Sequence, residues 1–160
     1  SWIAMMQCHC GSDRLLKDCC HQIWQQGGDL LSAERVMRAR YTAYVQGNID
    51  FLRITTLPIQ QAALDILQMT RWSQQTEWRG LQVISHQLAT HSQRHAWVIF
   101  TVSCREDGQS YTHHERSAFV RDAESWRFID PTVSLKAERN QACFCGSMQK
   151  FKRCCAPMLG

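Results

Sequence analysis

The sequence lacks any long hydrophobic run. Its apolar stretches span only a few residues, as at 96–100, far short of the roughly 20 that a transmembrane helix needs. Residues 1–6 have neither the basic region nor the extended apolar stretch of a secretory signal peptide. We therefore expect no membrane association and no export.

Cysteine, in contrast, is abundant and regularly spaced. Eight of the nine cysteines form two sets with one pattern, a C-x-C pair, an eight-residue gap and a C-C pair. The sets are Cys8, Cys10, Cys19 and Cys20, and Cys143, Cys145, Cys154 and Cys155. Gly-Ser follows both C-x-C pairs, and glycine permits the tight turn that brings two thiolates to one ion. Because four thiolates suit tetrahedral Zn²⁺, the repeat predicts two zinc sites.

A disulfide framework is the alternative explanation of these cysteines. Three observations argue against it. The number of cysteines is odd, adjacent cysteines bridge poorly to each other, and a chain of 160 residues is long enough to bury a core without disulfides. Four thiolates leave no coordination position for water, so both ions are expected to be structural. Each would stabilise a segment too small to fold alone, with Leu15, Leu16 and Phe151 as apolar plugs.

Two histidines and the ninth cysteine bear on these sites. His9 lies between two predicted ligands and His21 follows Cys20, so either ring can replace a cysteine of the first site. We favour positions that face solvent or lie behind the ligands. Cys104 lies in an apolar stretch and is expected to be a small buried hydrophobic residue.

The charge of the chain argues against a globally basic nucleic-acid binder. Its formal charge is +4, and two zinc ions bound by thiolates would bring the sum to about zero. Only the last segment is locally basic, with Lys136, Arg139, Lys150, Lys152 and Arg153 against Glu138. Two interpretations are open. The patch binds an anionic partner, which is a phosphate or an acidic protein surface, or its cations only offset the thiolate charge.

Between the cysteine sets the apolar periodicity changes once. Residues 29–46, 50–55 and 60–72 have helical spacing. From residue 77 the period becomes two, which predicts strands at 77–88, 96–105, 111–121 and 126–129, with a hairpin turn at Asp107-Gly108. We expect an α+β fold, three helices on a curved antiparallel meander that leaves a cone-shaped pocket. The expected domains are 1–27, 28–135 and 136–160.

Four segments resemble landmarks of the bacterial YchJ family. They are MRARYTAY at 37–44, TEWRGL at 76–81, ERSAF at 115–119 and WRFID at 126–130. The resemblance covers nearly the whole chain and implies a domain similar to nuclear transport factor 2 (NTF2), flanked by two zinc-binding SEC-C motifs. A similar motif in the tail of the SecA translocation ATPase recognises a chaperone and the ribosome. The resemblance therefore implies a zinc-dependent interaction module near translation or protein quality control.

In this hypothesis the second motif binds carboxylates or phosphates through Lys150, Lys152 and Arg153. The expected partner is a chaperone, a translocation component or a ribosomal component, and nucleic acid would be contacted only through the ribosome. Reduced thiolates and the absence of an export signal imply a cytoplasmic location. Both a monomer and a homodimer are compatible with the sequence.

The competing hypothesis is a small-ligand binder or an enzyme that uses the cone-shaped pocket. His113 and Glu115 lie on one face of a predicted strand, about 7 Å apart along it, and form a weak candidate acid–base pair. His114 and Arg116, on the opposite face, would suit an anionic ligand.

Structural roles compete with each of these assignments. Tyr41 and Tyr44 share one helical face, as core residues or as a pocket wall. Glu115 and Arg116 can instead form cross-strand ion pairs or meet Arg38 and Arg40 of the first long helix.

Overall fold

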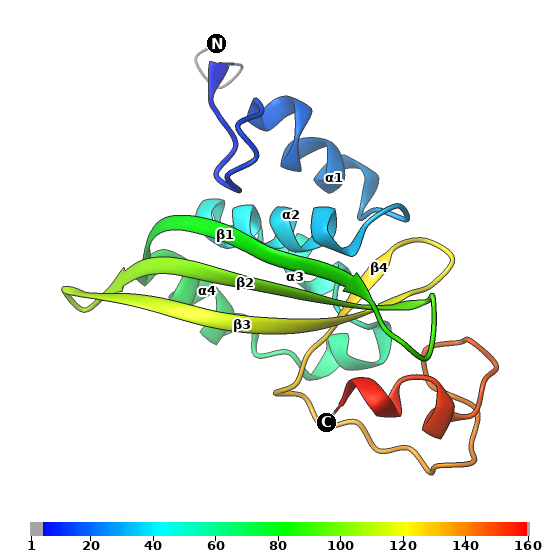
Figure 1. Cartoon of the computed structure of the whole chain (residues 1–160). Helices are drawn as coiled ribbons and strands as arrows, with labels where there is room; N and C mark the ends of the chain where they lie inside the picture. Colours follow the sequence, from blue (N-terminus) through cyan, green and yellow to red (C-terminus); the bar gives the residue numbers. More distant parts are fainter. Residues whose placement is uncertain (1–4, 160) are drawn as a thin grey trace.

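A four-stranded antiparallel meander in the order β1-β2-β3-β4 runs through the protein (Figure 1). The strands are β1 (Glu77–Leu88), β2 (His95–Glu106), β3 (Gln109–Arg121) and β4 (Trp126–Ile129). The structure, a computed structural model, describes residues 5–159. Asp107 and Gly108 form the β2–β3 turn with φ of 50° and 78°, as expected for a two-residue hairpin loop in a twisted sheet. The predicted antiparallel sheet is confirmed.

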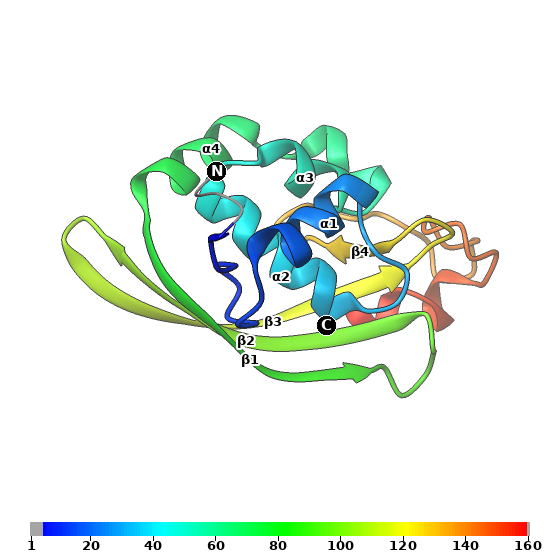
Figure 2. The same ribbon diagram turned by 90° about the horizontal axis from the view of Figure 1, so that it is seen from above.

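Helices cover one face of the sheet, which curves around them (Figure 2). They are α1 (Cys20–Gln26), α2 (Ala33–Gln46), α3 (Ile49–Ile54) and α4 (Ile66–Gln75). The central helix α2 contacts β1, β2 and β4. Three helices were expected from the apolar periodicity. Helix α1 is an additional one, and its seven residues are too few to show a period. Within residues 5–159, no helix combines the length and the apolar composition needed to cross a bilayer.

Caps set the helix boundaries that the periodicity placed wrongly. Helix α2 begins at Ala33 rather than at residue 29, because the Ser32 hydroxyl accepts the Arg35 N–H at 3.3 Å and caps the helix there. The Asp29 carboxylate accepts the N–H groups of Leu31 and Ser32, and it holds the preceding turn.

The helix predicted at 60–72 is two elements. A 3-10 helix spans Pro58–Ala63, and α4 begins at Ile66. Asp65 accepts the Gln68 N–H at 3.0 Å and caps α4, so the break lies inside the apolar pattern that favoured one continuous helix.

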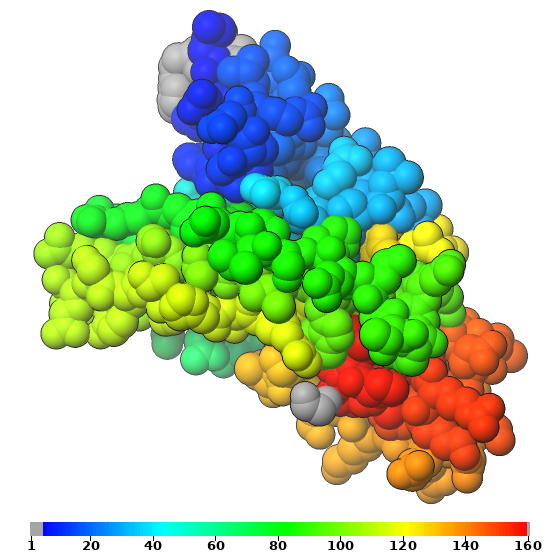
Figure 3. Space-filling model, in the orientation of Figure 1, coloured from blue at the N-terminus to red at the C-terminus, as the bar shows by residue number. Residues whose placement is uncertain are grey.

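The two cysteine segments pack on different sides of the central domain (Figure 3). The N-terminal segment packs on α2 and α3, where Leu16 and Ile23 join Ala39 and Leu52 in one buried cluster. The C-terminal segment includes the 3-10 helices Phe151–Arg153 and Ala156–Met158. It packs on Ala118 and Val120 of β3 and on the end of β4. Each cysteine segment therefore shares a core with the central domain.

Candidate metal centres

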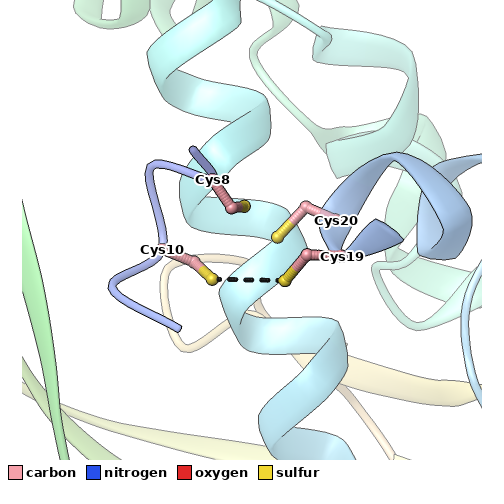
Figure 4. A group of neighbouring side chains, drawn as sticks. All are labelled: Cys8, Cys10, Cys19 and Cys20. Atoms are coloured by element: carbon pink, nitrogen blue, oxygen red, sulfur yellow. Dashed lines mark hydrogen bonds between the residues drawn. The ribbon is translucent and has the colours of Figure 1, made fainter. Parts of the chain in front are cut away.

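The four sulfurs of the N-terminal set come together at the base of α1 (Figure 4). Cys8 and Cys10 lie on the preceding loop, and Cys19 and Cys20 at the start of the helix. All four sulfurs lie within 4.8 Å of one another, and the Cys10 and Cys19 sulfurs are 3.6 Å apart. Tetrahedral zinc with Zn–S near 2.3 Å spaces its sulfurs by about 3.8 Å. The set therefore fits one metal ion held by four thiolates.

A tight loop positions the first two cysteines. Gly11 has φ of 80°, and a Cβ built there would lie 3.1 Å from the Leu81 carbonyl oxygen of β1. Glycine is thus required both by the left-handed backbone and by the close approach to the sheet. The Cys8 N–H donates to the Arg14 carbonyl at 2.8 Å and closes the loop. The Ser12 hydroxyl lies 3.2 Å from the Cys19 sulfur.

The C-terminal set repeats this local structure. Its four sulfurs also lie within 4.8 Å of one another, with Cys145 and Cys154 3.5 Å apart. Gly146 has φ of 84°, and the Ser147 hydroxyl lies 3.1 Å from the Cys154 sulfur. The Cys143 N–H donates to the Gln149 carbonyl at 2.7 Å. All nine cysteines, each within the described residues, are free thiols, so the predicted four-cysteine clusters form without disulfides.

Hydrogen bonding within each set lowers the pKa of one of its cysteines. Hydrogen bonds from the Cys20 and Cys8 thiols hold the pKa of Cys10 far below its usual value. Bonds from Cys143 and Cys155 do the same for Cys145. Because thiolates rather than thiols bind metals, the lowered pKa of Cys10 and of Cys145 favours metal binding.

Thr42 ties the N-terminal set to the central domain. This residue of α2 is fully buried, and its hydroxyl lies 3.2 Å from the Cys20 sulfur and 3.7 Å from the Cys8 sulfur. Arg38, one turn earlier on α2, donates to the Cys10 carbonyl at 2.6 Å. The cysteine loop is thus hydrogen-bonded to the helix that carries the core.

His95 has the corresponding role at the C-terminal set. Its Nε2 lies 3.3 Å from the Cys155 sulfur and 3.7 Å from the Cys154 sulfur. Its Nδ1 lies 2.7 Å from the Ser92 hydroxyl. Burial, with a further contribution from His91, lowers the pKa of His95 to about 4, so the ring is neutral and can donate one N–H to a sulfur. Sequence reasoning missed Thr42 and His95, because nothing local marks a residue that meets cysteines distant in the chain.

Neither candidate histidine joins the N-terminal set. The His9 ring lies 3.2 Å from the Gln46 side-chain nitrogen, and the His21 ring packs on Trp24 at 4.8 Å between centroids. The group of metal-ligating atoms at this site consists of the four cysteines.

The structure pairs His113 with a carboxylate other than Glu115. The His113 Nε2 lies 3.4 Å from Oε1 of Glu106, whereas Glu115 is exposed and lies opposite Phe100 in the register. An acid–base role for His113 and Glu115 stays a prediction.

The four residues suggested for a ligand pocket do not come together. Tyr41 and Tyr44 lie on the helix side, where both pack on Trp78. Arg116 and His114 are exposed and lie opposite Ile99 and Thr101 of β2 in the register, on the face of the sheet that turns away from the helices. A ligand-binding role for either pair stays a prediction.

Two of the three arginines of α2, Arg38 and Arg40, have partners outside β3. Arg38 pairs with Glu34 at 2.9 Å. Arg40 is buried and donates to the Leu52 carbonyl and the Thr55 hydroxyl, each at 2.8 Å. Among the described residues neither arginine forms an ion pair with Glu115, so the expected link from α2 to β3 is not seen.

The three cations of the C-terminal motif lie at its surface. Lys150 and Arg153 are exposed, and Lys152 is half-buried. Within the described part of the chain, none of them forms an ion pair. Arg153 also lines a hollow of about 400 Å³ between the motif and the β1–β2 loop, together with His91, Arg94 and Gln149.

Family models match the central domain and the C-terminal cysteine motif. The family model described as "YchJ, middle NTF2-like domain" matches residues 32–131, and that of the SEC-C motif matches residues 139–157. The crystal structure of a SEC-C motif containing protein from Psychrobacter arcticus is similar with a TM-score of 0.84 and 36% identity. It covers 98% of this chain and 99% of that one. The solution structure of RPA3114, a SEC-C motif containing protein from Rhodopseudomonas palustris, has a TM-score of 0.70 and 28% identity over 78% of this chain and 96% of that one.

Proposed function

The chain belongs to the YchJ family, and we propose that it is a zinc-binding interaction protein whose C-terminal SEC-C motif binds an anionic partner. Zinc suits both cysteine sets, since four thiolates in a closed tetrahedral arrangement are typical of structural zinc. Because the closed shell leaves no coordination position, the metal has a structural role and the surface around it makes the contacts.

The observation that carries this proposal is a charge difference between two copies of one scaffold. The N-terminal gap between ligand pairs contains Asp13, Arg14, Lys17 and Asp18, whose charges cancel. The C-terminal gap contains Lys150, Lys152 and Arg153 and no acidic residue. If cations were needed only to offset thiolate charge, both copies would need them equally. The charge of +3 in one gap therefore points to a function at its surface.

The surroundings of these cations support binding to carboxylates or phosphates. Lys150 and Arg153 are exposed, and Arg94 adds its positive charge at the hollow beside Arg153. Charge-assisted hydrogen bonds from such groups to anionic oxygens are among the stronger ones. The proposed partner is an acidic surface of a chaperone or translocation component, or the ribosome, contacted by a protein in the cytoplasm.

The test compares charge removal at the two motifs. The triple variant Lys150→Ala, Lys152→Ala, Arg153→Ala removes the basic surface, and the control variant Arg14→Ala, Lys17→Ala changes the same gap of the other motif. Each protein is co-sedimented with purified bacterial ribosomes and used to capture proteins from a bacterial lysate, at low and moderate salt. Metal content and melting temperature are measured for both.

We expect the wild type and the control to retain a ribosomal or acidic protein partner in a salt-sensitive manner, and the triple variant to lose it while it keeps its metal. Equal capture by the triple variant and the wild type would contradict the proposal, as would a wild type that binds neither ribosomes nor an acidic protein.

A further inference from the structure

A third group of metal-ligating side chains lies near the tip of the β2–β3 hairpin, and it shares no residue with the two cysteine sets. It consists of Cys104, Glu106 and His113, whose donor atoms lie within 4.8 Å of one another. The Glu106 Oε1 is 3.6 Å from the Cys104 sulfur and 3.4 Å from the His113 Nε2. A tetrahedral zinc ion with ordinary Zn–S, Zn–N and Zn–O distances would separate such donors by about 3.3–3.6 Å. These two separations already match that geometry.

The hairpin accounts for this convergence. Cys104 and Glu106 are two residues apart on β2 and therefore share a face. His113 lies opposite Val102 and Tyr111 lies opposite Cys104 in the register, so His113 is a diagonal neighbour of Cys104, within reach of a long side chain. A two-residue turn fixes this register. The three donors are thus held by one rigid hairpin rather than by a flexible loop.

The surrounding side chains orient these donors and leave one side open. The Trp72 indole N–H of α4 donates to Glu106 Oε1 at 3.3 Å, and Tyr111 stacks on the His113 ring. Cys104 is 1% exposed and backed by the buried Tyr41 and Val102. The side chains of Glu106 and His113, in contrast, are 31% and 38% exposed. The buried thiol of Cys104 and the two partly exposed donors of Glu106 and His113 therefore form a site that is open to solvent on one side.

We propose that Cys104, Glu106 and His113 bind a divalent metal ion of the zinc class, with one coordination position left for water or a ligand. The sulfur, nitrogen and oxygen donors suit such an ion, and three protein ligands with an open position are the arrangement found in catalytic zinc sites. Neither a buried hydrophobic role for Cys104 nor a plain ion pair between His113 and Glu106 requires all three donors to converge. The site is independent of the function proposed for the SEC-C motifs.

The test uses the full-length protein with both four-cysteine sets filled by zinc and loosely bound metal removed by gel filtration. Co²⁺ is then titrated, because its bond to a thiolate gives a charge-transfer absorption and because Co²⁺ binds a given site more weakly than Zn²⁺ does, so the filled four-thiolate sites keep their zinc. We expect one further equivalent of metal with this absorption. Cys104→Ser removes the absorption and His113→Gln weakens binding. Trp72→Phe removes the orienting N–H along with part of the ring that packs on Tyr44 and Trp78, and we expect it to weaken binding by about tenfold.

His114→Gln is the matched control, since His114 neighbours His113 but lies on the opposite face of the strand. It binds the further equivalent as the wild type does. All variants are compared by melting temperature and by their content of two zinc ions, so that a misfolded variant is recognised. Glu106→Gln provides a second ligand variant, at a half-buried position. The proposal is overturned if the wild type takes up no further equivalent, or if Cys104→Ser leaves the absorption unchanged.

Discussion

The Nε2 of His95, the first residue of β2, lies 3.3 Å from the sulfur of Cys155, 60 positions later in the chain. Thr42 makes the corresponding contact at the N-terminal set, 3.2 Å from the Cys20 sulfur. In each case one buried polar side chain of the central domain contacts a cysteine sulfur on the side that faces the domain. The two cysteine segments and the central domain therefore form one folded body, and the side of each segment that faces the domain is fixed.

Replacing His95 by Phe should loosen the C-terminal metal centre without removing a ligand. A group that donates to a ligand orients it and tunes its basicity, and its loss typically costs about 10- to 100-fold in metal affinity. The measurement is zinc release to a chromogenic chelator, which we expect to become biphasic, with one faster phase. His95→Gln restores an N–H donor and should recover part of the affinity. His86→Phe, at an exposed position of β1, is the control, and the prediction is wrong if it accelerates release as much as His95→Phe does.

Two glycines at equivalent positions provide a test of the docking of the N-terminal motif. Gly11 and Gly146 have φ of 80° and 84°, so alanine at either position would adopt a left-handed backbone, which costs about 1–2 kcal/mol of folding free energy. Only Gly11 also approaches β1, where a Cβ would lie 3.1 Å from the Leu81 oxygen, whereas a Cβ at Gly146 would meet nothing within 4 Å. Gly11→Ala should therefore lower the free energy of unfolding by more than Gly146→Ala does. Equal losses in denaturant unfolding would show that the close approach to β1 costs nothing.

Removal of the metal should destabilise the central domain as well as the ends of the chain. The Cys8, Cys10 and Cys20 side chains belong to the same buried cluster as Ala39, Leu52 and other residues of α2 and α3. We expect a strong chelator to lower the melting temperature by at least about 10 °C, since each 1 kcal/mol shifts it by about 2–4 °C in a chain of this size. Readded zinc should reverse the change. A central domain that melts at the same temperature with and without metal would show that the motifs are energetically separate.

Asp122 should contribute stability that depends on pH. Burial alone would raise the pKa of this carboxyl, but the N–H groups of Glu124 and Ser125 and the Arg127 guanidinium outweigh it and lower the pKa below 3.8. Because the folded-state pKa lies below the unfolded value, the contribution is present above the unfolded pKa and is lost as the pH falls through the folded one. The difference in unfolding free energy between wild type and Asp122→Asn should therefore shrink between about pH 5 and pH 3.

A difference that stays constant over this range would contradict the assignment. Glu124→Gln is the control, since its side chain is 82% exposed and its contact with Arg127 is screened by solvent. We expect that variant to change stability little at any pH.

The parts of the structure that depend on local patterns were predictable. A repeated cysteine spacing, together with Gly11 and Gly146, dictates the same loop twice. Leu16 and Phe151 are buried as expected of apolar plugs, whereas Leu15 is only half-buried. Alternation at a period of two marked the strands, and Asp107-Gly108 marked the hairpin. The break at Asp65 was not predicted, because a capping carboxylate within an apolar period has the same sequence pattern as one exposed position of a longer helix.

Long-range contacts were not predictable from one sequence. Thr42 and His95 have no feature that connects them with cysteines 22 and 60 residues away. Cys104 was correctly expected to be buried, but its convergence with Glu106 and His113 depends on the strand register and on side-chain directions. A pattern of apolar residues fixes which face is buried, and it does not show which polar atoms meet there.

The zinc content of three proteins, measured by elemental analysis after removal of loosely bound metal, tests the central claim most directly. The proteins are the wild type, the variant Cys19→Ser, Cys20→Ser and the variant Cys154→Ser, Cys155→Ser. Two independent four-thiolate centres predict two zinc ions per chain in the wild type and one in each variant. A wild type without zinc, or a variant that still holds two ions, would contradict the assignment of the two cysteine sets.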